Sequence, residues 1–394
     1  MRAIGYQQPG TIDRTEALVD IELPDPNATG RDLLVEVKAV SVNPVDTKVR
    51  AGSGSIHGDW RVLGWDAAGV VRAVGPEVRG FEPGDEVFYA GSIGRDGTNA
   101  ELHLVDERIV GKKPASLDWA EAAALPLTAI TAWEALFERL SVRTPVAGAA
   151  HALLIVGGAG GVGSMAIQLA RQVPELIVIA TASRPETQAW VAELGAHHVI
   201  DHRQPLARQV ANLGIGAPAF VFSTTHTDEH IEQIAEMIAP QGRFALIDDP
   251  KTLDVVPFKR KSVSTHWEFM FTRSMFETAD METQGQILST IASLVDAGDV
   301  RTTLTERFSP STPRTSSVRT RRLRALPHAA RSSSRVGSDA VHAHPQRPPC
   351  PRPPPHQLKR TKPRRYRCQP CAVVGVAFAG SLISTIIKDR DVLR

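Results

Sequence analysis

The sequence predicts an α/β protein in which a strand-rich N-terminal part precedes a doubly wound parallel sheet. Two observations lead to this prediction. From residue 151 onwards, short apolar runs alternate with helical patterns, as expected for a parallel sheet covered by helices on both faces. Before that point, residues 1–125 contain alternating apolar stretches that are separated by frequent glycines, which is typical of strands and turns.

The first 125 residues supply the elements of the strand-rich part. Apolar and polar residues alternate over Arg31–Val42, which predicts a half-buried strand. Gly64–Gly91 carries glycines at short intervals, and Pro83–Gly84–Asp85 within it predicts a turn. A helical pattern then covers Ala120–Leu140, with an interruption near Pro126.

A glycine-rich turn opens the second part. Three glycines have the G-x-G-x-x-G spacing between a strand pattern at Leu153–Val156 and a helix pattern at Gly163–Arg171. The first permits a tight turn, the second a close approach of backbone N–H groups to a pyrophosphate, and the third close packing of the helix. The anion would lie at the helix N-terminus, so we predict a Rossmann dinucleotide site here. Its expected members are Gly158, Gly160, Gly161, Val162 and Gly163.

The next strand pattern, Leu176–Ser183, indicates which dinucleotide binds. A site for NAD usually ends this strand with an acidic residue that binds the ribose 2′-hydroxyl. Here Ser183 and Arg184 stand instead, and a hydroxyl with a guanidinium suits a 2′-phosphate. The sequence therefore favours NADPH over NADH, although an ordinary exposed arginine at a strand end would look the same.

Further strands and helices follow in alternation. The predicted strands are Leu153–Val156, Ile177–Ala180, His198–Ile200, Phe220–Ser223 and Phe244–Ile247, with a last candidate at Thr302–Leu304. The predicted helices are Gly163–Arg171, Glu186–Leu194, Glu229–Ile238 and Met281–Ala297. Ligands bind at the carboxyl edge of such a sheet. We therefore expect Ser223, Thr224 and Ile247 to contact the cofactor.

Charge and cysteine content narrow the function classes. The net charge of +2 hides an asymmetry, because residues 311–370 hold 15 lysines and arginines against one acid, Asp339. The first 310 residues are thus acidic, which argues against nucleic-acid binding by this body. The three cysteines all lie in the tail, at positions 350, 368 and 371. The N-terminus lacks the apolar core of a secretion signal, so a cytoplasmic enzyme is expected.

Several motifs, taken in order, resemble the medium-chain dehydrogenase/reductase superfamily. They are VSVNPVDTKVRAG, GWDAAGVV, PGDEVF, AALPLTAITAWEAL, GGAGGVGSMAIQLAR and ELGAHHVIDH. FSTTHTD, PQGRFALIDDP and FKRKSVSTHWEFMFTRSMF point to the quinone-oxidoreductase-like branch that is labelled zinc-type alcohol dehydrogenase-like. The resemblance covers residues 1–309. It implies a GroES-like catalytic domain at 1–125, completed by about 265–310, a Rossmann NADPH-binding domain at 126–264, a cleft between them, and a homodimer.

The words "zinc-type" in the name of this branch raise the question of whether the chain has the residues to bind zinc. Zinc-dependent relatives have cysteine where this chain has Asn43, and a His–Glu pair where it has Trp65–Asp66. They also carry four cysteines in a structural lobe, and the corresponding region here has none. A catalytic zinc needs about three ligands from Cys, His and carboxylates. We therefore predict no metal in the body.

Without a Lewis acid, reduction of a simple ketone loses its main oxyanion stabilisation. Conjugate reduction suffers less, because the charge spreads to a distant oxygen that hydrogen-bond donors can stabilise. We therefore predict a zinc-independent, NADPH-dependent oxidoreductase that reduces quinones or α,β-unsaturated carbonyls. Two alternatives stay open: a zinc-type dehydrogenase of small alcohols or aldehydes, and a non-catalytic NADPH-binding protein.

Four residues are candidates for the catalytic site. Asn43 and Asp46 occupy the position where zinc enzymes begin their metal site, although Asn43–Pro44 would equally shape a turn. Tyr89 and His266 are candidate proton donors, although a structural role between aromatic neighbours is the more common one for such a histidine.

Two threonines complete the expected cofactor site. Thr128 and Thr131 match the segment whose hydroxyls approach the nicotinamide in the family, and helix capping is the competing interpretation.

The family pattern stops near residue 310. Residues 311–394 are rich in Arg, Pro, Ser and His and lack an apolar period, so they are expected to be disordered or aberrant. Three interpretations stay open: a frameshift, a basic functional tail, and a membrane anchor at Cys371–Ile387, whose 17 uncharged residues are at the lower limit for a span. The frameshift is favoured over the membrane anchor because the break falls inside a domain.

Overall fold

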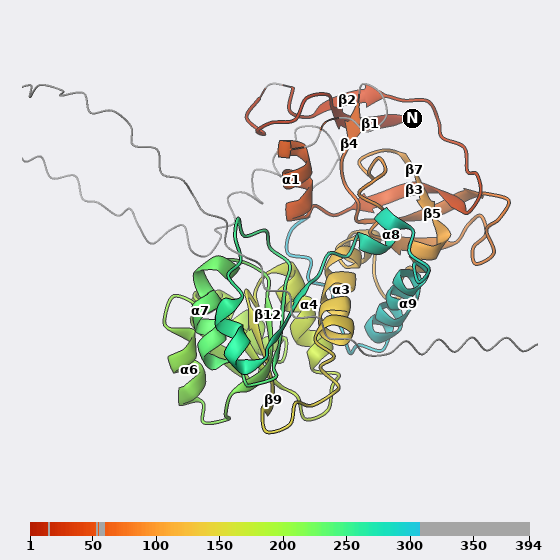
Figure 1. Ribbon diagram of the computed structural model, residues 1–394. Helices are drawn as coiled ribbons and strands as arrows, with labels where there is room; N and C mark the ends of the chain where they lie inside the picture. Colours follow the sequence, from red (N-terminus) through yellow and green to blue (C-terminus); the bar gives the residue numbers. More distant parts are fainter. Residues whose placement is uncertain (15, 53, 55–59, 308–394) are drawn as a thin grey trace, which may run out of the picture. The chain divides into compact units, whose positions relative to one another are not determined.

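The computed structural model describes residues 1–14, 16–52, 54 and 60–307. Two lobes are evident in this part of the chain (Figure 1). We call the first, built on antiparallel sheets from residues 2–112, the strand-rich lobe, and the second, built on the sheet of residues 150–267, the parallel-sheet lobe. The tail after residue 310, and each interpretation of it, lies outside the described residues.

Two antiparallel sheets form the strand-rich lobe. Their strands are β1 (Arg2–Tyr6), β2 (Val19–Glu22), β3 (Asp32–Val40), β4 (Arg61–Val62), β5 (Ala67–Val74), β6 (Glu86–Tyr89), β7 (Leu102–Asp106) and β8 (Val110–Lys112). The order is β2-β1-β4 in one sheet and β7-β3-β5-β6-β8 in the other. The predicted strand at 31–42 and turn at 83–85 are both confirmed, since β3 covers the former and Gly84 has φ of +101° in the latter.

The helical pattern between the lobes divides into several elements, as its proline indicated. They are α2 (Trp119–Ala123), α3 (Pro126–Trp133) and the π-helical turn η2 (Glu134–Arg139). Two further helices, α1 (Pro44–Gly52) and the short 3-10 helix η1 (Glu107–Ile109), come earlier in the chain. Pro126 occupies the first turn of α3, where its missing N–H costs nothing. In Figure 1, α3 lies between the strand-rich lobe and α4 (Gly161–Ala170), against which it packs.

The parallel-sheet lobe has the predicted Rossmann architecture. Its strands are β9 (Ala150–Val156), β10 (Ile177–Thr181), β11 (His198–Ile200), β12 (Pro218–Ser223), β13 (Arg243–Leu246) and β14 (Ser264–Trp267). They are all parallel, in the order β11-β10-β9-β12-β13-β14. Besides α4, its helices are α5 (Pro185–Glu193), α6 (Leu206–Asn212), α7 (Thr227–Met237) and the 3-10 helix η3 (Val256–Lys261). The chain adds β10 and β11 on one side of β9 and β12 to β14 on the other side. This change of direction defines a ligand crevice at the carboxyl ends of the strands.

Two predictions about this region need correction. Thr302–Leu304 is not a strand, because its groups form single hydrogen bonds rather than a ladder. The Thr302 hydroxyl donates to the distant Glu121 carbonyl, and the Leu304 amide donates to the Thr302 hydroxyl. β14 was not predicted, because the short sequence Ser-Thr-His-Trp shows neither an apolar run nor a clear alternation.

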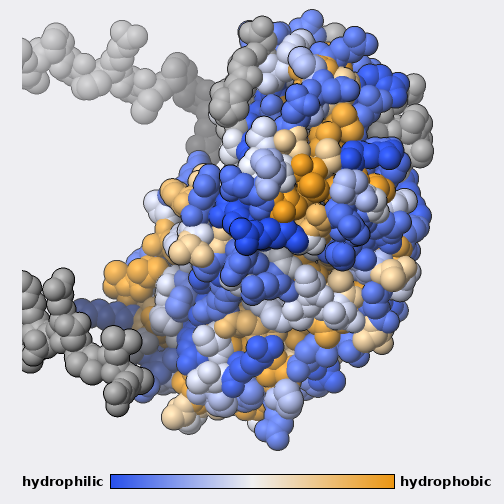
Figure 2. All heavy atoms as spheres, turned by 90° about the vertical axis from the view of Figure 1, so that its right-hand side faces the viewer, coloured by the Kyte–Doolittle hydropathy of each residue, from blue (hydrophilic) through white to orange (hydrophobic). Residues whose placement is uncertain are grey.

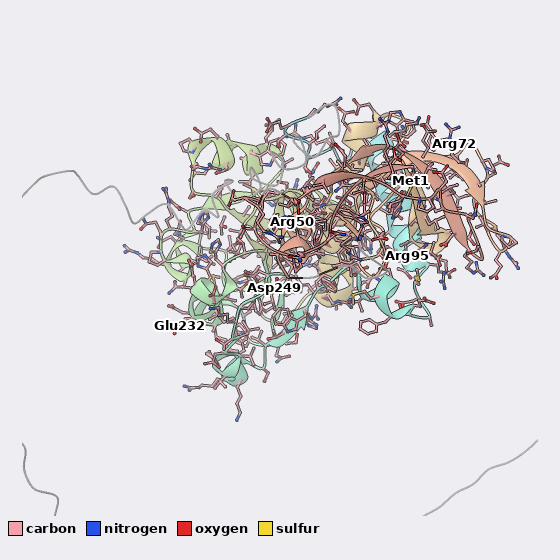
Figure 3. The ribbon with its side chains drawn as sticks, turned by 90° about the horizontal axis from the view of Figure 1, so that it is seen from above. Met1, Arg50, Arg72, Arg95, Glu232 and Asp249 are labelled. Carbon is pink, nitrogen blue, oxygen red and sulfur yellow. The ribbon has the colours of Figure 1, made fainter. Side chains whose placement is uncertain are left out.

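The last described helices, α8 (Thr272–Phe276) and α9 (Thr283–Asp296), lie beside the strand-rich lobe (Figure 1). Gly111 on β8 permits this packing, because a Cβ there would lie 2.6 Å from the Cβ of Leu288 on α9. The face in Figure 2 is largely hydrophilic with small hydrophobic groups between. Within the described residues, no helix has both the length and the apolar character needed to cross a bilayer.

Candidate active site

A large cleft runs between the two lobes and reaches the carboxyl edge of the parallel sheet. Ten of the residues expected to form the site line it: Asn43, Thr128, Thr131, Gly160, Gly161, Val162, Ser183, Arg184, Thr224 and Ile247. Six others lie behind or away from this surface: Asp46, Tyr89, Gly158, Gly163, Ser223 and His266. The structure therefore brings together most of the expected cofactor residues, whereas Asn43 is the one catalytic candidate of the four that lines the cleft.

The glycine turn is shaped by close backbone contacts. A Cβ on Gly163 would lie 2.3 Å from the Gly157 carbonyl oxygen, so α4 packs against the turn only with glycine there. A Cβ on Gly160 would meet nothing nearer than 3.4 Å, which leaves that glycine open towards the cleft. α4 begins after Gly160 without a side-chain cap, so its first N–H groups are available to an anion.

A fifth glycine of this turn, Gly157, was not among the expected residues. Gly157 has φ of +83°, and a Cβ there would lie 2.3 Å from the Thr224 hydroxyl oxygen. Its amide donates to the Thr181 hydroxyl at 2.9 Å, and Thr224 donates to the Val156 carbonyl at 2.9 Å. The absence of a side chain at Gly157 thus allows the end of β12 to lie close to the turn. The double glycine after β9 was the available signal.

The turn after β10 holds the predicted phosphate-binding residues. Ser183 and Arg184 line the cleft together with Thr187 and His202. Arg203, which forms an ion pair with Asp201 at 2.7 Å, donates to the Ser183 carbonyl at 2.6 Å and braces the turn. Among these lining residues there is no carboxylate that would repel a 2′-phosphate.

Asn43 is held by a buried hydrogen-bond network. Its side-chain amide donates to one carboxylate oxygen of Asp66 at 2.7 Å, and its backbone amide donates to Asp46 at 2.7 Å. The other oxygen of Asp66 accepts from the Leu127 amide at 2.7 Å, in the first turn of α3. Asp66 therefore joins the start of α1, β5 and α3, and it orients the Asn43 side chain at the cleft surface.

Burial dominates the electrostatics of Asp66. Loss of solvent raises its pKa to about 8, and the hydrogen bonds from Asn43 and Leu127 oppose this rise only in part. Asp46 is buried beside it, and its second oxygen accepts from the Gly64 amide at 2.9 Å. Asp46 thus accepts hydrogen bonds from backbone amides and does not line the cleft, which corrects its assignment as a catalytic candidate.

The side chains at this position are not those that zinc prefers. Both oxygens of Asp66 and both of Asp46 accept hydrogen bonds from amides, as described above. Asn43 and Trp65 replace the thiolate and imidazole that zinc prefers. Among the residues that the structure describes, no three His, Cys, Asp or Glu side chains gather in a way that could hold a metal.

The two expected proton donors occupy other surroundings. The Tyr89 hydroxyl is fully buried and pairs with Nδ1 of His103 at 3.1 Å, and the two rings stack at 5.5 Å. Burial lowers the pKa of His103 to about 4, so this pair stays neutral in the strand-rich core. His266 lies on β14 and contacts the Ser264 hydroxyl at 3.1 Å. Neither side chain reaches the cleft surface, so neither serves as a donor there.

Thr128 and Thr131 line the cleft from α3. Their hydroxyls donate to the carbonyl groups of Leu125 and Leu127, at 3.0 and 2.7 Å. Their oxygens therefore present lone pairs to the cleft. On the opposite wall, the Ile247 amide donates to the Ser223 carbonyl at 3.3 Å, while the Ser223 hydroxyl accepts from Thr227. Ser223 is thus a buried support for Ile247.

Two family models match this chain. The alcohol dehydrogenase GroES-like domain matches residues 29–115, and the zinc-binding dehydrogenase domain matches residues 161–283. A zinc-type alcohol dehydrogenase-like protein of Staphylococcus aureus (strain MSSA476) is 39% identical over 315 residues, covering 79% of this chain and 93% of the relative. The chain belongs to the medium-chain dehydrogenase/reductase superfamily. It is therefore an oxidoreductase by family, with the GroES-like and Rossmann parts that the sequence predicted, and this superfamily binds nicotinamide cofactors.

Solved structures of this superfamily agree with the fold. A Rhizobium etli CFN 42 protein named for zinc-dependent alcohol dehydrogenases is 64% identical, with a TM-score of 0.81, covering 82% of this chain and 95% of the other. An Escherichia coli quinone oxidoreductase complexed with NADPH has a TM-score of 0.64 at 21% identity, covering 77% and 91%. The relatives thus carry names of both classes, alcohol dehydrogenase and quinone oxidoreductase.

Proposed function

We propose that this chain is a zinc-independent, NADPH-dependent oxidoreductase that reduces quinones or α,β-unsaturated carbonyls by hydride transfer. The observation that carries the proposal is the Asn43–Asp66–Leu127 network. Asn43 and Asp66 stand at positions where the resemblance implies metal ligands in zinc-dependent relatives, and here the two side chains are hydrogen-bonded to each other. A quinone oxidoreductase of Lama guanicoe, 29% identical over 283 residues, adds support from the relatives.

The residues of the cleft fit a bound dinucleotide phosphate. The open side of Gly160 and the uncapped start of α4 would hold the pyrophosphate. Ser183 and Arg184 would bind the 2′-phosphate, since a guanidinium carries permanent charge and a fork of donors. NADPH, when bound, supplies the hydride. Thr128, Thr131 and Ile247 would enclose the nicotinamide from both walls of the cleft.

The protein's own contribution to the chemistry is placement and charge stabilisation. As hydride reaches the β-carbon of the acceptor, negative charge develops on its carbonyl oxygen, and a solvent proton completes the reduction. One N–H of the Asn43 side chain binds Asp66, which leaves the second N–H to donate to that oxygen. Because Asp66 fixes the amide, this donor is oriented before the acceptor arrives.

An acceptor screen tests the proposal. Purified protein is assayed for NADPH and NADH oxidation with quinones, enones, simple aldehydes and ketones, and for the reverse reaction with alcohols, each with EDTA or added Zn²⁺. We expect turnover of quinones or enones with NADPH that EDTA does not reduce. Turnover of alcohols alone, dependent on added zinc, would instead show the zinc-type dehydrogenase. NADPH binding without any turnover would show a non-catalytic protein.

We also propose that two copies associate through β14. This strand pairs only with β13 in the described sheet, so its other edge is open. Trp267 on this strand is 53% exposed, and Val256 in the preceding turn is 71% exposed. Sedimentation equilibrium is expected to give a dimer, and a monomer at micromolar concentrations contradicts this assignment.

A further inference from the structure

Two buried glutamates meet behind one wall of the cleft. Glu134 begins the π-helical turn after α3, three residues beyond Thr131 of the cleft lining. Glu268 follows β14 directly, and its amide donates to the Leu246 carbonyl at 3.0 Å. Their side chains are 1% and 0% exposed. The two carboxyl groups thus come from segments far apart in sequence and share one interior site.

Two arginines and two further acids surround this pair. Arg139 donates to Glu268 at 2.8 Å and lies 3.9 Å from Glu134, and Arg273 of α8 donates to the other oxygen of Glu134. Arg273 also binds two acids nearer the surface, Glu138 at 2.9 Å and Asp280 at 3.0 Å. Another ionisable group nearby is His266 of β14, whose pKa is lowered by burial and by the charges of Arg139 and Arg243.

Burial and the neighbouring acids favour a proton on this pair of glutamates. Burial, followed by the neighbouring charge of Glu268, raises the pKa of Glu134, and burial also raises the pKa of Glu268. Oε1 of Glu268 is buried without a hydrogen-bond donor when both groups are ionised, and a proton on Glu134 supplies that donor. Two carboxyl groups in contact therefore titrate as one unit, as in other carboxyl dyads.

The pair is attached directly to the cleft wall. Glu268 is the first residue of the segment 268–271, all of which lines the cleft. Phe269 and Phe271 form an edge-to-face contact at 5.5 Å, and Phe271 meets Trp65 of the strand-rich lobe at 6.0 Å. Phe269, Phe271 and Asn43 all line the same cleft.

We propose that the proton shared by Glu134 and Glu268 acts as a clamp that fixes the aromatic wall of residues 268–271 and so positions the acceptor. The two glutamates are positioning residues, because they act through Phe269 and Phe271. Loss of the shared proton leaves two adjacent buried negative charges, which repel each other and release the wall from α3. The effect of this proton loss on acceptor binding rests on the proposed function, whereas its effect on the order of residues 268–271 does not.

Amide hydrogen exchange of residues 264–276, corrected for the intrinsic rate at each pH, tests the clamp without any substrate. We expect protection in the wild type that decreases at alkaline pH. Glu134→Gln keeps a neutral donor to Glu268, so its protection should be high and independent of pH. Glu134→Ala should exchange roughly tenfold faster than the wild type at neutral pH, as expected for loss of one buried charge-assisted hydrogen bond. This difference should shrink at alkaline pH, where the wild type loses the shared proton. Glu138→Gln is the matched control, because Glu138 also binds Arg273 but lies nearer the surface. Its protection should still decrease at alkaline pH, with the decrease beginning at a lower pH, because the charge of Glu138 helps to raise the pKa of Glu134.

The kinetic readout uses the same variants. The KM for the acceptor should rise at alkaline pH in the wild type and stay flat in Glu134→Gln, while the Kd for NADPH is unchanged in both. The proposal is wrong if wild-type protection does not change with pH, or if Glu134→Gln loses protection as Glu134→Ala does. Absence of turnover in the wild type, with the exchange results as expected, would refute the proposed function and leave the clamp intact.

Discussion

The side-chain amide of Asn43 donates to Asp66 across 2.7 Å, over 23 positions of sequence. The bond ties the start of α1 to β5 and, through the Leu127 amide, to α3. It therefore fixes the position of the cleft surface at Asn43 relative to the helix that carries Thr128 and Thr131.

Removing the amide tests the role of Asn43. Asn43→Ala loses the proposed donor to the developing oxyanion, and we expect kcat to fall by about 10²-fold, as for loss of one oxyanion donor. The Kd for NADPH, from fluorescence titration, should stay within about twofold. Thr47→Ala, an exposed change one turn further along α1, is the control. An Asn43→Ala enzyme with wild-type kcat would remove Asn43 from the mechanism.

Replacing Asp66 should change the pH dependence of stability. The pKa of this group is about 8 when folded and about 3.9 in an unfolded chain, so its favourable contribution is fully present below pH 4 and is lost as pH rises towards 8. Asp66→Asn cannot titrate. Urea unfolding between pH 5 and 8 should therefore show a smaller decrease in the free energy of unfolding for the variant than for the wild type. Equal slopes would mean that Asp66 does not carry this pH dependence.

Arg184 should control cofactor preference. Arg184→Ala removes the proposed contact with the 2′-phosphate, and we expect the KM for NADPH to rise about 10- to 100-fold, the loss typical of a charge-assisted hydrogen bond, while the KM for NADH barely changes. Arg208→Ala, an exposed arginine on α6, is the matched control. A parallel rise for both cofactors would show that Arg184 serves the fold and does not read the phosphate.

Alanine substitutions at Gly163 and Gly160 of the turn should have different effects on stability and on NADPH binding. A Cβ on Gly163 meets the Gly157 carbonyl at 2.3 Å, so Gly163→Ala should lower the Tm by several degrees. A Cβ on Gly160 has room in the protein alone, so Gly160→Ala should keep its Tm and lose affinity for NADPH. Thermal melts with and without NADPH separate the two. A lower Tm for Gly160→Ala without cofactor would contradict the assignment.

Local patterns sufficed for the parallel sheet. β9 to β13 follow apolar runs, and the glycine register located the turn before α4. They were insufficient for β14, whose four residues gain their strand conformation from pairing with β13. The fold class, and most of the residues that line the cleft around the glycine turn, were therefore predictable from sequence.

The network around Asn43 was less accessible. The sequence identified Asn43 and Asp66 as replacements for zinc ligands, but their contact, and that of Asp66 with α3, depends on the packing of three elements. Tyr89 and His266 were chosen for their titration properties, whereas burial in the strand-rich core and a place on β14 determine their surroundings. Side-chain chemistry alone does not specify which face of a strand reaches a ligand.

The π-helical turn after α3 has a consequence for how this region tolerates changes in length. The Leu140 amide donates to the Ala135 carbonyl, five positions back, so residues five apart lie on one face. In an α-helix Glu134 and Arg139 would point about 140° apart. The number of residues in this turn, as much as their identity, therefore decides whether both side chains meet Glu268. A one-residue deletion there would rotate Arg139 away while leaving all three residues in the chain.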